Sequence, residues 1–175
     1  MRGIGTPGEG RVVWHTVFIV LHAVAATVAL LAGLVAVPAG RLFGLYRWAL
    51  AGLVVFLVPA LMIDWTEFDV LDKMIFSVLL VLAAVMFYRA VLAGRMLPAT
   101  TGGPSGAYLD HVGFGLISLS VAFAVTAVLR GGAPGWLVAV SGVGVAAVGY
   151  FALGAVKARL VDLRDAEGLG VRGHA

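Results

Sequence analysis

Long apolar runs alternate with short polar segments along the whole chain. A transmembrane helix needs about 20 apolar residues, and five runs are long enough. The pattern predicts spans at 13–37, 45–63, 71–92, 108–129 and 136–156. The connections between them are short, which favours antiparallel neighbours. We therefore expect an all-α fold, an integral membrane bundle of five transmembrane helices.

Polar segments flank the predicted transmembrane domain of residues 13–157. Residues 1–12 form a Gly-rich polar lead, and the apolar run behind it is far longer than the core of a secretory signal peptide. Residues 158–175 form a tail of mixed charge. We expect this tail to extend the last helix by a turn or two and then to fray.

The amino-acid composition excludes a soluble globular protein. The chain has 175 residues, of which 62% are hydrophobic and 12% are charged, whereas soluble domains carry about 25% charged residues. There is no cysteine, which removes disulfides, thiolate metal sites and cysteine nucleophiles. The richness in Arg, Ala, Val and Gly favours a bacterial source, so we expect a multi-pass protein of the bacterial cytoplasmic (inner) membrane.

Basic residues are distributed unequally between the two predicted sides of the membrane. Eight lie on the side that holds the first loop, the third loop and the tail, and four lie on the other side. The positive-inside rule predicts an outer N-terminus and a cytoplasmic C-terminus. Trp14 is then an outer aromatic anchor, and Tyr46 and Trp48 are inner ones. The net charge of +3 comes without a basic run, so we expect no nucleic-acid partner.

Small residues mark the helix faces that are expected to pack together. The first span carries Ala25, Ala29 and Gly33 at intervals of four residues, and similar stripes include Gly115 in the fourth span and Gly142 in the fifth. Small side chains let helices approach closely in lipid. The stripes predict a packing core built from the first, fourth and fifth spans.

Three histidines lie within these apolar spans. His15 and His22 are seven residues apart and share one helix face, and His111 lies near the start of the fourth span. An ionisable side chain inside a membrane is costly and therefore usually has a function. The structural alternative is a neutral ring that joins two helices by one hydrogen bond of roughly 1 kcal/mol.

Charged residues near the span ends supply the remaining candidates. One histidine and four acids map to the outer ends of the first three spans: His15, Asp64, Glu67, Asp69 and Asp72. They would bind a divalent cation or relay protons, or form only a solvated acidic rim. Asp64 lies where it would contact His15. On the inner side, Arg89 and Asp110 are expected to form an ion pair or to reach water separately.

Haem b is the one cofactor that the residue types suggest. Two histidines on neighbouring helices, with small residues beside them, are typical ligands of a haem held in a bundle. His22 and His111 are therefore the candidate axial ligands. Their predicted depths differ by roughly 13 Å at the rise of an α-helix, which argues against a shared iron.

Three functional hypotheses follow. No Walker loop, HExxH motif or nucleophile pattern occurs, so we expect no enzyme. The first hypothesis is an oligomeric or accessory membrane subunit that packs through Ala/Gly helix faces and has membrane lipids, its own copies or a larger complex as partners. The second is a small-solute or proton-coupled transporter that uses His22 and the His15/Asp64 cluster. The third is a haem-binding electron carrier.

Overall fold

The computed structural model describes residues 7–97 and 105–172, which form five helices. They are α1 (Pro7–Ala39), α2 (Phe43–Asp64), α3 (Val70–Arg95), α4 (Gly106–Arg130) and α5 (Gly135–Arg172). Each contains a segment that is long and apolar enough to cross a membrane. The expectation of an all-helical chain with five such helices is confirmed.

Turn residues end α1 where the sequence predicts the first span to stop. Pro38 lies inside the last turn of the helix. The next residue but one, Gly40, has a φ of 64°, and its N–H donates to the carbonyl of Ala36 at 2.8 Å. A glycine in this left-handed conformation is a common helix cap because it has no Cβ to clash. The chain then turns back into α2.

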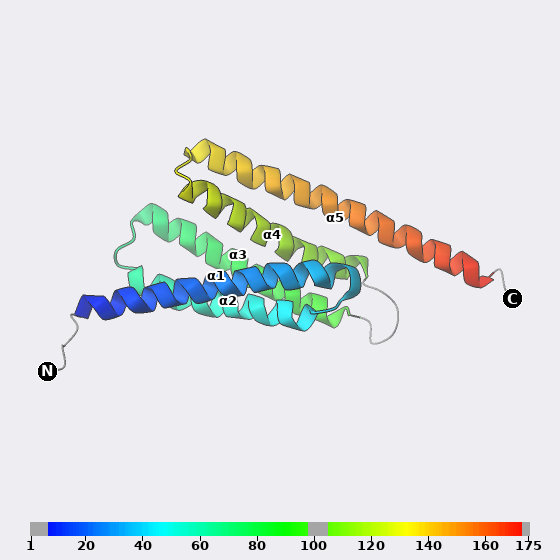
Figure 1. Cartoon of the computed structure of the whole chain (residues 1–175), viewed down its shortest axis with the longest axis horizontal. Helices are drawn as coiled ribbons and strands as arrows, with labels where there is room; N and C mark the ends of the chain where they lie inside the picture. The colour runs from blue at the N-terminus through cyan, green and yellow to red at the C-terminus, as the bar shows by residue number, and fades with distance from the viewer. Residues whose placement is uncertain (1–6, 98–104, 173–175) are drawn as a thin grey trace.

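The last helix is much longer than its predicted span. α5 continues to Arg172, so most of the predicted tail of residues 158–175 is helical rather than frayed. Its 38 residues measure about 57 Å at 1.5 Å per residue, against a hydrocarbon core of about 30 Å. Figure 1 shows the end of α5 extending past the other helices.

Successive helices run in alternating directions, and α5 lies at the edge of the bundle (Figure 1). α1 packs against α2 and α4, and α3 packs against the same two helices, whereas α4 is the one described helix that α5 contacts. All the buried hydrophobic residues of the described part of the chain come from α1 to α4. The predicted core of first, fourth and fifth spans is therefore wrong. A stripe of small residues shows that a helix has a close neighbour but does not show which one.

Alanines make the close contacts of α1. Ala29 and Ala36 are completely buried, and Ala26 and Ala32 are nearly so. They recur every three or four residues, which places them on one face of the helix. Inside lipid there is no hydrophobic drive between helices, so association depends on dispersion contacts and on close approach. This alanine face provides that approach.

Tyr46 fills the space that two glycines leave open. Its side chain is completely buried. Its ring lies against Gly33 of α1, and its hydroxyl lies where a Cβ on Gly115 of α4 would be. The prediction that Tyr46 anchors the interface is wrong, because Tyr46, Leu50 and Leu53 repeat at helical spacing along the buried face of α2. Trp48 points away from this face and is 70% exposed.

Aromatic rings join α2 to α4 near the end of α1. The ring centroids of Phe43 and Tyr108 are 5.6 Å apart, and those of Phe43 and Tyr46 are 6.0 Å apart. The Tyr108 hydroxyl donates to the carbonyl of Ala36 in α1 at 3.0 Å. The cluster therefore fixes the start of α4 against the end of α1.

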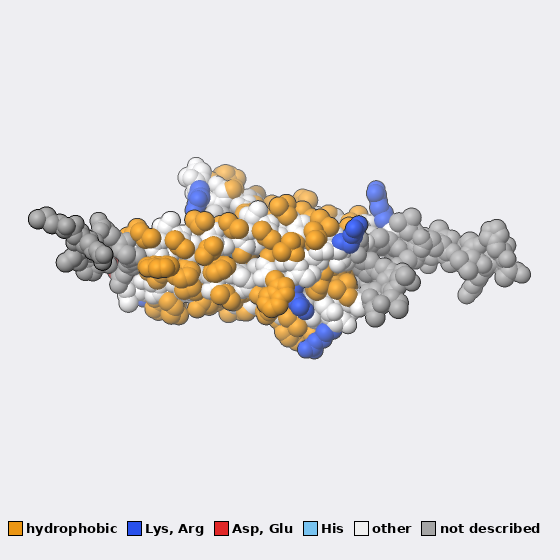
Figure 2. Space-filling model, turned by 60° about the horizontal axis from the view of Figure 1, so that its bottom comes forward, with side chains coloured by type: hydrophobic (Ala, Val, Ile, Leu, Met, Phe, Trp, Pro, Cys, Tyr) orange, Lys and Arg blue, Asp and Glu red, His pale blue; other side chains and the backbone are white. Residues whose placement is uncertain are grey.

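The surface of the bundle is apolar along its length. On the face in Figure 2, hydrophobic side chains cover most of the molecule, and Lys and Arg side chains stand out towards its ends. The end where α1 begins is called here the His15 end, and the opposite end, where α1 finishes, the Lys157 end. Such a surface matches a bilayer, in which only the helix ends meet water.

Gly115→Ala is expected to destabilise the bundle through Tyr46. The added Cβ would overlap the Tyr46 hydroxyl, whereas the ring carbon that bears this hydroxyl lies 3.4 Å away, an ordinary contact. Overpacking of this kind costs about 1–3 kcal/mol. Tyr46→Phe should restore the stability of Gly115→Ala. Thermal unfolding in detergent measures both effects.

Gly44→Ala is the matched control for this experiment, because nothing lies within 4 Å of the position of its Cβ. Equal melting temperatures for Gly115→Ala and the wild type, or no rescue by Tyr46→Phe, would contradict the close fit of Tyr46 to Gly115.

Candidate functional site

His15 and Asp64 meet at one end of the bundle, as the sequence predicts. Nε2 of His15 lies 3.2 Å from Oδ2 of Asp64, and the two side chains are 31% and 24% exposed. The contact joins the first part of α1 to the last residue of α2. Both residues lie near the ends of candidate membrane spans, and their side chains are partly exposed at the surface of the bundle.

The described part of the predicted outer cluster does not form a metal site. Within residues 7–97 and 105–172, no group of three or more His, Cys, Asp or Glu side chains is placed to hold a metal ion. The Asp72 side chain lies outside the described residues. His15 and Asp64 are two members of the cluster, and the structure brings them together.

His22 joins α1 to the middle of α2. Its Nδ1 lies 3.0 Å from the carbonyl oxygen of Leu53, and its side chain is partly buried. A carbonyl only accepts, so Nδ1 carries the proton and Nε2 is the nitrogen with a lone pair. The histidine thus bonds backbone across a helix interface, as the structural alternative predicts.

Hydroxyl groups in the spans behave differently from His22. Thr16 donates to the carbonyl of Val12, and Thr27 donates to that of Ala23, each at 2.9 Å and within α1. Such bonds to the preceding turn satisfy the hydroxyl without a second helix. His22 therefore differs from these threonines in linking two helices.

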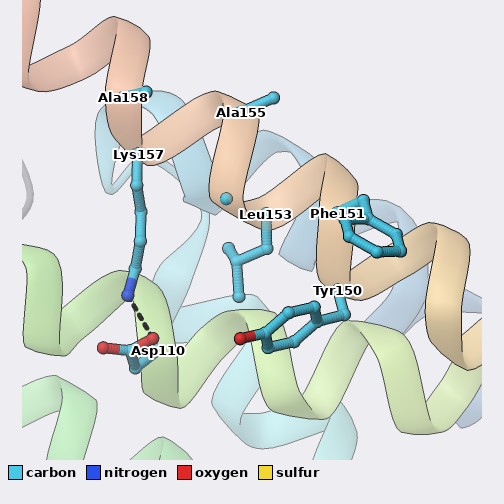
Figure 3. A pocket seen from close by; sticks show the side chains of 8 residues that line it. Asp110, Tyr150, Phe151, Leu153, Ala155, Lys157 and Ala158 are labelled. Carbon is cyan, nitrogen blue, oxygen red and sulfur yellow. Dashed lines mark hydrogen bonds and ion pairs between the residues drawn. The ribbon is translucent and has the colours of Figure 1, made fainter.

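A groove lies between α4 and α5 at the Lys157 end. Its volume is about 550 Å³, and Asp110 is the residue that α4 contributes to its lining. The Lys157 ammonium is bonded to the Asp110 carboxylate across the groove, while Leu153 and the exposed Tyr150 line it further along α5 (Figure 3). Leu153 packs on Gly113 of α4. The groove combines a charged mouth with an apolar floor.

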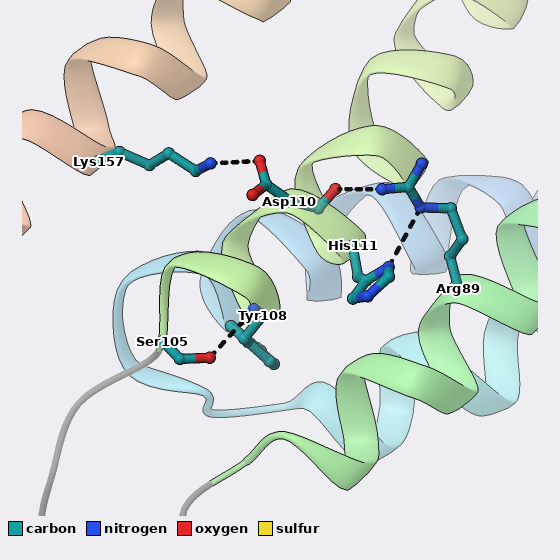
Figure 4. A network of polar contacts seen from close by, with 6 residues as sticks. All are labelled: Arg89, Ser105, Tyr108, Asp110, His111 and Lys157. Carbon is teal, nitrogen blue, oxygen red and sulfur yellow. Dashed lines mark hydrogen bonds and ion pairs between the residues drawn. The ribbon is translucent and has the colours of Figure 1, made fainter.

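Arg89 of α3 lies on the other side of Asp110 (Figure 4). Its Nε donates to Nδ1 of His111 at 3.2 Å, and its NH2 donates to the backbone carbonyl of Asp110 at 3.3 Å. Its guanidinium also lies 4.4 Å from the centre of the Phe114 ring. The expected ion pair of Arg89 with the Asp110 carboxylate is absent among these contacts, because that carboxylate pairs with Lys157 instead.

His22 and His111 lie at different levels of the bundle. Gly33 of α1 lies against Leu116 of α4. From that level His22 is eleven residues towards the His15 end, and His111 is five residues towards the Lys157 end. At about 1.5 Å per residue the rings are separated by roughly 24 Å along the bundle. This register argues against one haem iron bound by both rings.

The sequence does not predict the contacts of two residues of this region. Lys157 lies 47 residues from Asp110 in the chain, and this separation gives no sign of their contact. Tyr108 begins an apolar run, and its ring and hydroxyl suit a buried cap on a neighbouring helix.

Comparison of the chain with known proteins gives no further guide to the site. The chain matches no protein-family model, and no curated protein or solved structure is detectably similar to it. The assignment of function therefore depends on the geometry described above.

Replacing His22 by Leu is expected to lower the free energy of unfolding by about 1 kcal/mol, because one hydrogen bond between helices is lost. Thr27→Val serves as the control, since it removes a bond within a single helix. Unfolding in detergent measures both variants. Equal losses in the two would show that the His22 contact contributes nothing specific.

Proposed function

We propose that the chain is a non-enzymatic, multi-pass protein of a bacterial inner membrane, and that it assembles with copies of itself through α5. The observation that carries the proposal is the position of this helix. α5 contacts only α4, and no residue in its most apolar window is buried. One long apolar helix is thus available to another subunit.

The two faces of α5 both carry small residues. On the inward face, a Cβ at Gly142 would meet Val125, and one at Gly149 would meet Ile117, so these glycines serve the contact with α4. On the outward face, nothing lies within 4 Å of a Cβ at Gly144. Around it, Val140 and Val148 are 59% and 70% exposed. A small residue on an exposed helix face lets a second helix approach closely in lipid.

A second copy of the chain is the occupant that suits this face. From Gly135 to Val156, α5 carries no charged residue, so a two-fold contact brings no like charges together. We place the Lys157 end in the cytoplasm, because most of the basic residues belong to the loops and tail on that side.

Gly144→Leu is expected to convert the oligomer to a monomer, because the larger side chain prevents close approach of two α5 helices. Gly44→Leu is the matched control, since Gly44 of α2 also has nothing within 4 Å of its Cβ position. Light scattering of the detergent-solubilised protein and cross-linking in membranes measure the state.

Three outcomes contradict this proposal. They are a monomeric wild type, a Gly144→Leu variant with an unchanged oligomeric state, and equal effects of Gly144→Leu and Gly44→Leu. A wild type that is monomeric alone but copurifies with a different membrane protein would replace the homo-oligomer by an accessory subunit.

Proton-coupled transport is a second candidate, favoured by the arrangement of polar groups between α1 and α2. His15 and Asp64 form a partly exposed pair near the ends of α1 and α2. His22 lies seven residues deeper on α1, about 10 Å along the helix axis. In a neutral ring, its Nε2 has a lone pair that is able to accept a proton while Nδ1 donates to the Leu53 carbonyl. This arrangement resembles the entrance of a proton path.

Proton flux into liposomes that hold the purified protein tests the second candidate. A carrier loses its flux in His22→Ala and in Asp64→Asn, and keeps it in the control Thr27→Val. Flux that matches empty liposomes, or that survives in both His22→Ala and Asp64→Asn, rejects transport through these residues.

A further inference from the structure

The groove between α4 and α5 has the form of a ligand site. Its volume of about 550 Å³ lies within the range of about 300–1,000 Å³ that small-molecule sites occupy. It is lined by Tyr150, Leu153 and Gly154 in its apolar part and by Asp110 and Lys157 at its mouth (Figure 3). No side chain fills the space beside Gly154, where nothing lies within 4 Å of a Cβ.

The charges around the groove favour an anion. Two cations flank one carboxylate, since Lys157 bonds the Asp110 side chain and Arg89 bonds the Asp110 backbone (Figure 4). The three side chains together carry one net positive charge. An ammonium has three N–H donors, and the bond to Asp110 uses one of them. Lys157 lines the groove, and its side chain is 30% exposed.

The depth of the groove matches the interface of a bilayer. Lys157 lies two residues before the end of the apolar segment Gly135–Arg159, where basic residues meet phosphate groups. Tyr150 is seven residues deeper, about 10 Å at the rise of an α-helix. A lipid whose headgroup lies at the mouth of the groove would therefore have its acyl chain along the apolar floor.

We propose that this groove binds one anionic phospholipid, with its phosphate on Lys157 and an acyl chain along Leu153 and Tyr150. The inference rests on the membrane location in the proposed function, but not on the contact between α5 helices. The lipid covers a groove that α4 and α5 leave open, and so holds the peripheral helix to its one neighbour.

The experiment measures binding of phosphatidylglycerol to the delipidated full-length protein in detergent. Phosphatidylcholine with the same acyl chains and inorganic phosphate are the comparison ligands. We expect phosphatidylglycerol to bind more tightly than phosphatidylcholine, and phosphate to compete poorly because it has no acyl chain. Lys157→Gln should weaken phosphatidylglycerol about fivefold, which corresponds to about 1 kcal/mol for one basic residue at a membrane surface.

The Asp110→Asn variant distinguishes a lipid-binding role of Lys157 from a purely structural ion pair. If Lys157 serves only to pair with Asp110, both single variants disturb α4 and α5 alike and neither improves binding. If Lys157 holds a lipid phosphate, Asp110→Asn removes a competing carboxylate and should tighten phosphatidylglycerol binding. Lys157→Arg should retain most of the affinity, because it keeps the charge.

Arg159→Gln is the control for general attraction to anionic lipid. Arg159 is an exposed cation of the same helix and does not line the groove. Equal weakening by Lys157→Gln and Arg159→Gln, no preference for phosphatidylglycerol, or weaker binding in Asp110→Asn would each overturn the lipid site. Failure of the Gly144→Leu experiment affects only the α5 contact between copies, so the two proposals fail separately.

Discussion

The bundle depends on how closely α1, α2 and α4 approach one another around Tyr46. Gly33 and Gly115 supply the space for its ring and hydroxyl, and alanines such as Ala29 and Ala36 bring α1 near its neighbours. Lipid removes the hydrophobic drive that holds soluble bundles together, so contact between atoms has to replace it. A bulky aromatic residue that enters a pair of glycine notches makes many such contacts and fixes the relative positions of three helices.

Polar groups then fix which helices are neighbours and how they align. Each polar contact between helices joins one particular pair. His15–Asp64 and His22–Leu53 join α1 to α2, Tyr108–Ala36 joins α1 to α4, Arg89–His111 joins α3 to α4, and Lys157–Asp110 joins α4 to α5. A polar group in hydrocarbon is costly when it lacks a partner. A shifted register would leave several of these groups unpaired at once, so the contacts specify alignment even where each contributes little stability.

The local pattern of the sequence predicts the helices well, because length and hydropathy are properties of one segment. It also predicts the His15–Asp64 contact, since both residues end adjacent antiparallel spans and must lie at the same level. The local pattern does not predict contacts between residues that are distant in the chain. Nothing local to Asp110 distinguishes Arg89 from Lys157, and the glycines of α5 indicate a close neighbour without naming it. The burial of Tyr46 was open to prediction from its spacing to Leu50 and Leu53, but its ring suits an interface equally well.

The peripheral place of α5 has a consequence for how the protein is made. Chains are synthesised and inserted from the N-terminus, and their parts generally fold in that order. All the buried hydrophobic residues in the described part of the chain precede Arg130. These residues have therefore all been synthesised before α5 leaves the ribosome. The last helix then joins a finished four-helix unit along one side only. The helix that is made last is thus the one on which the buried core depends least.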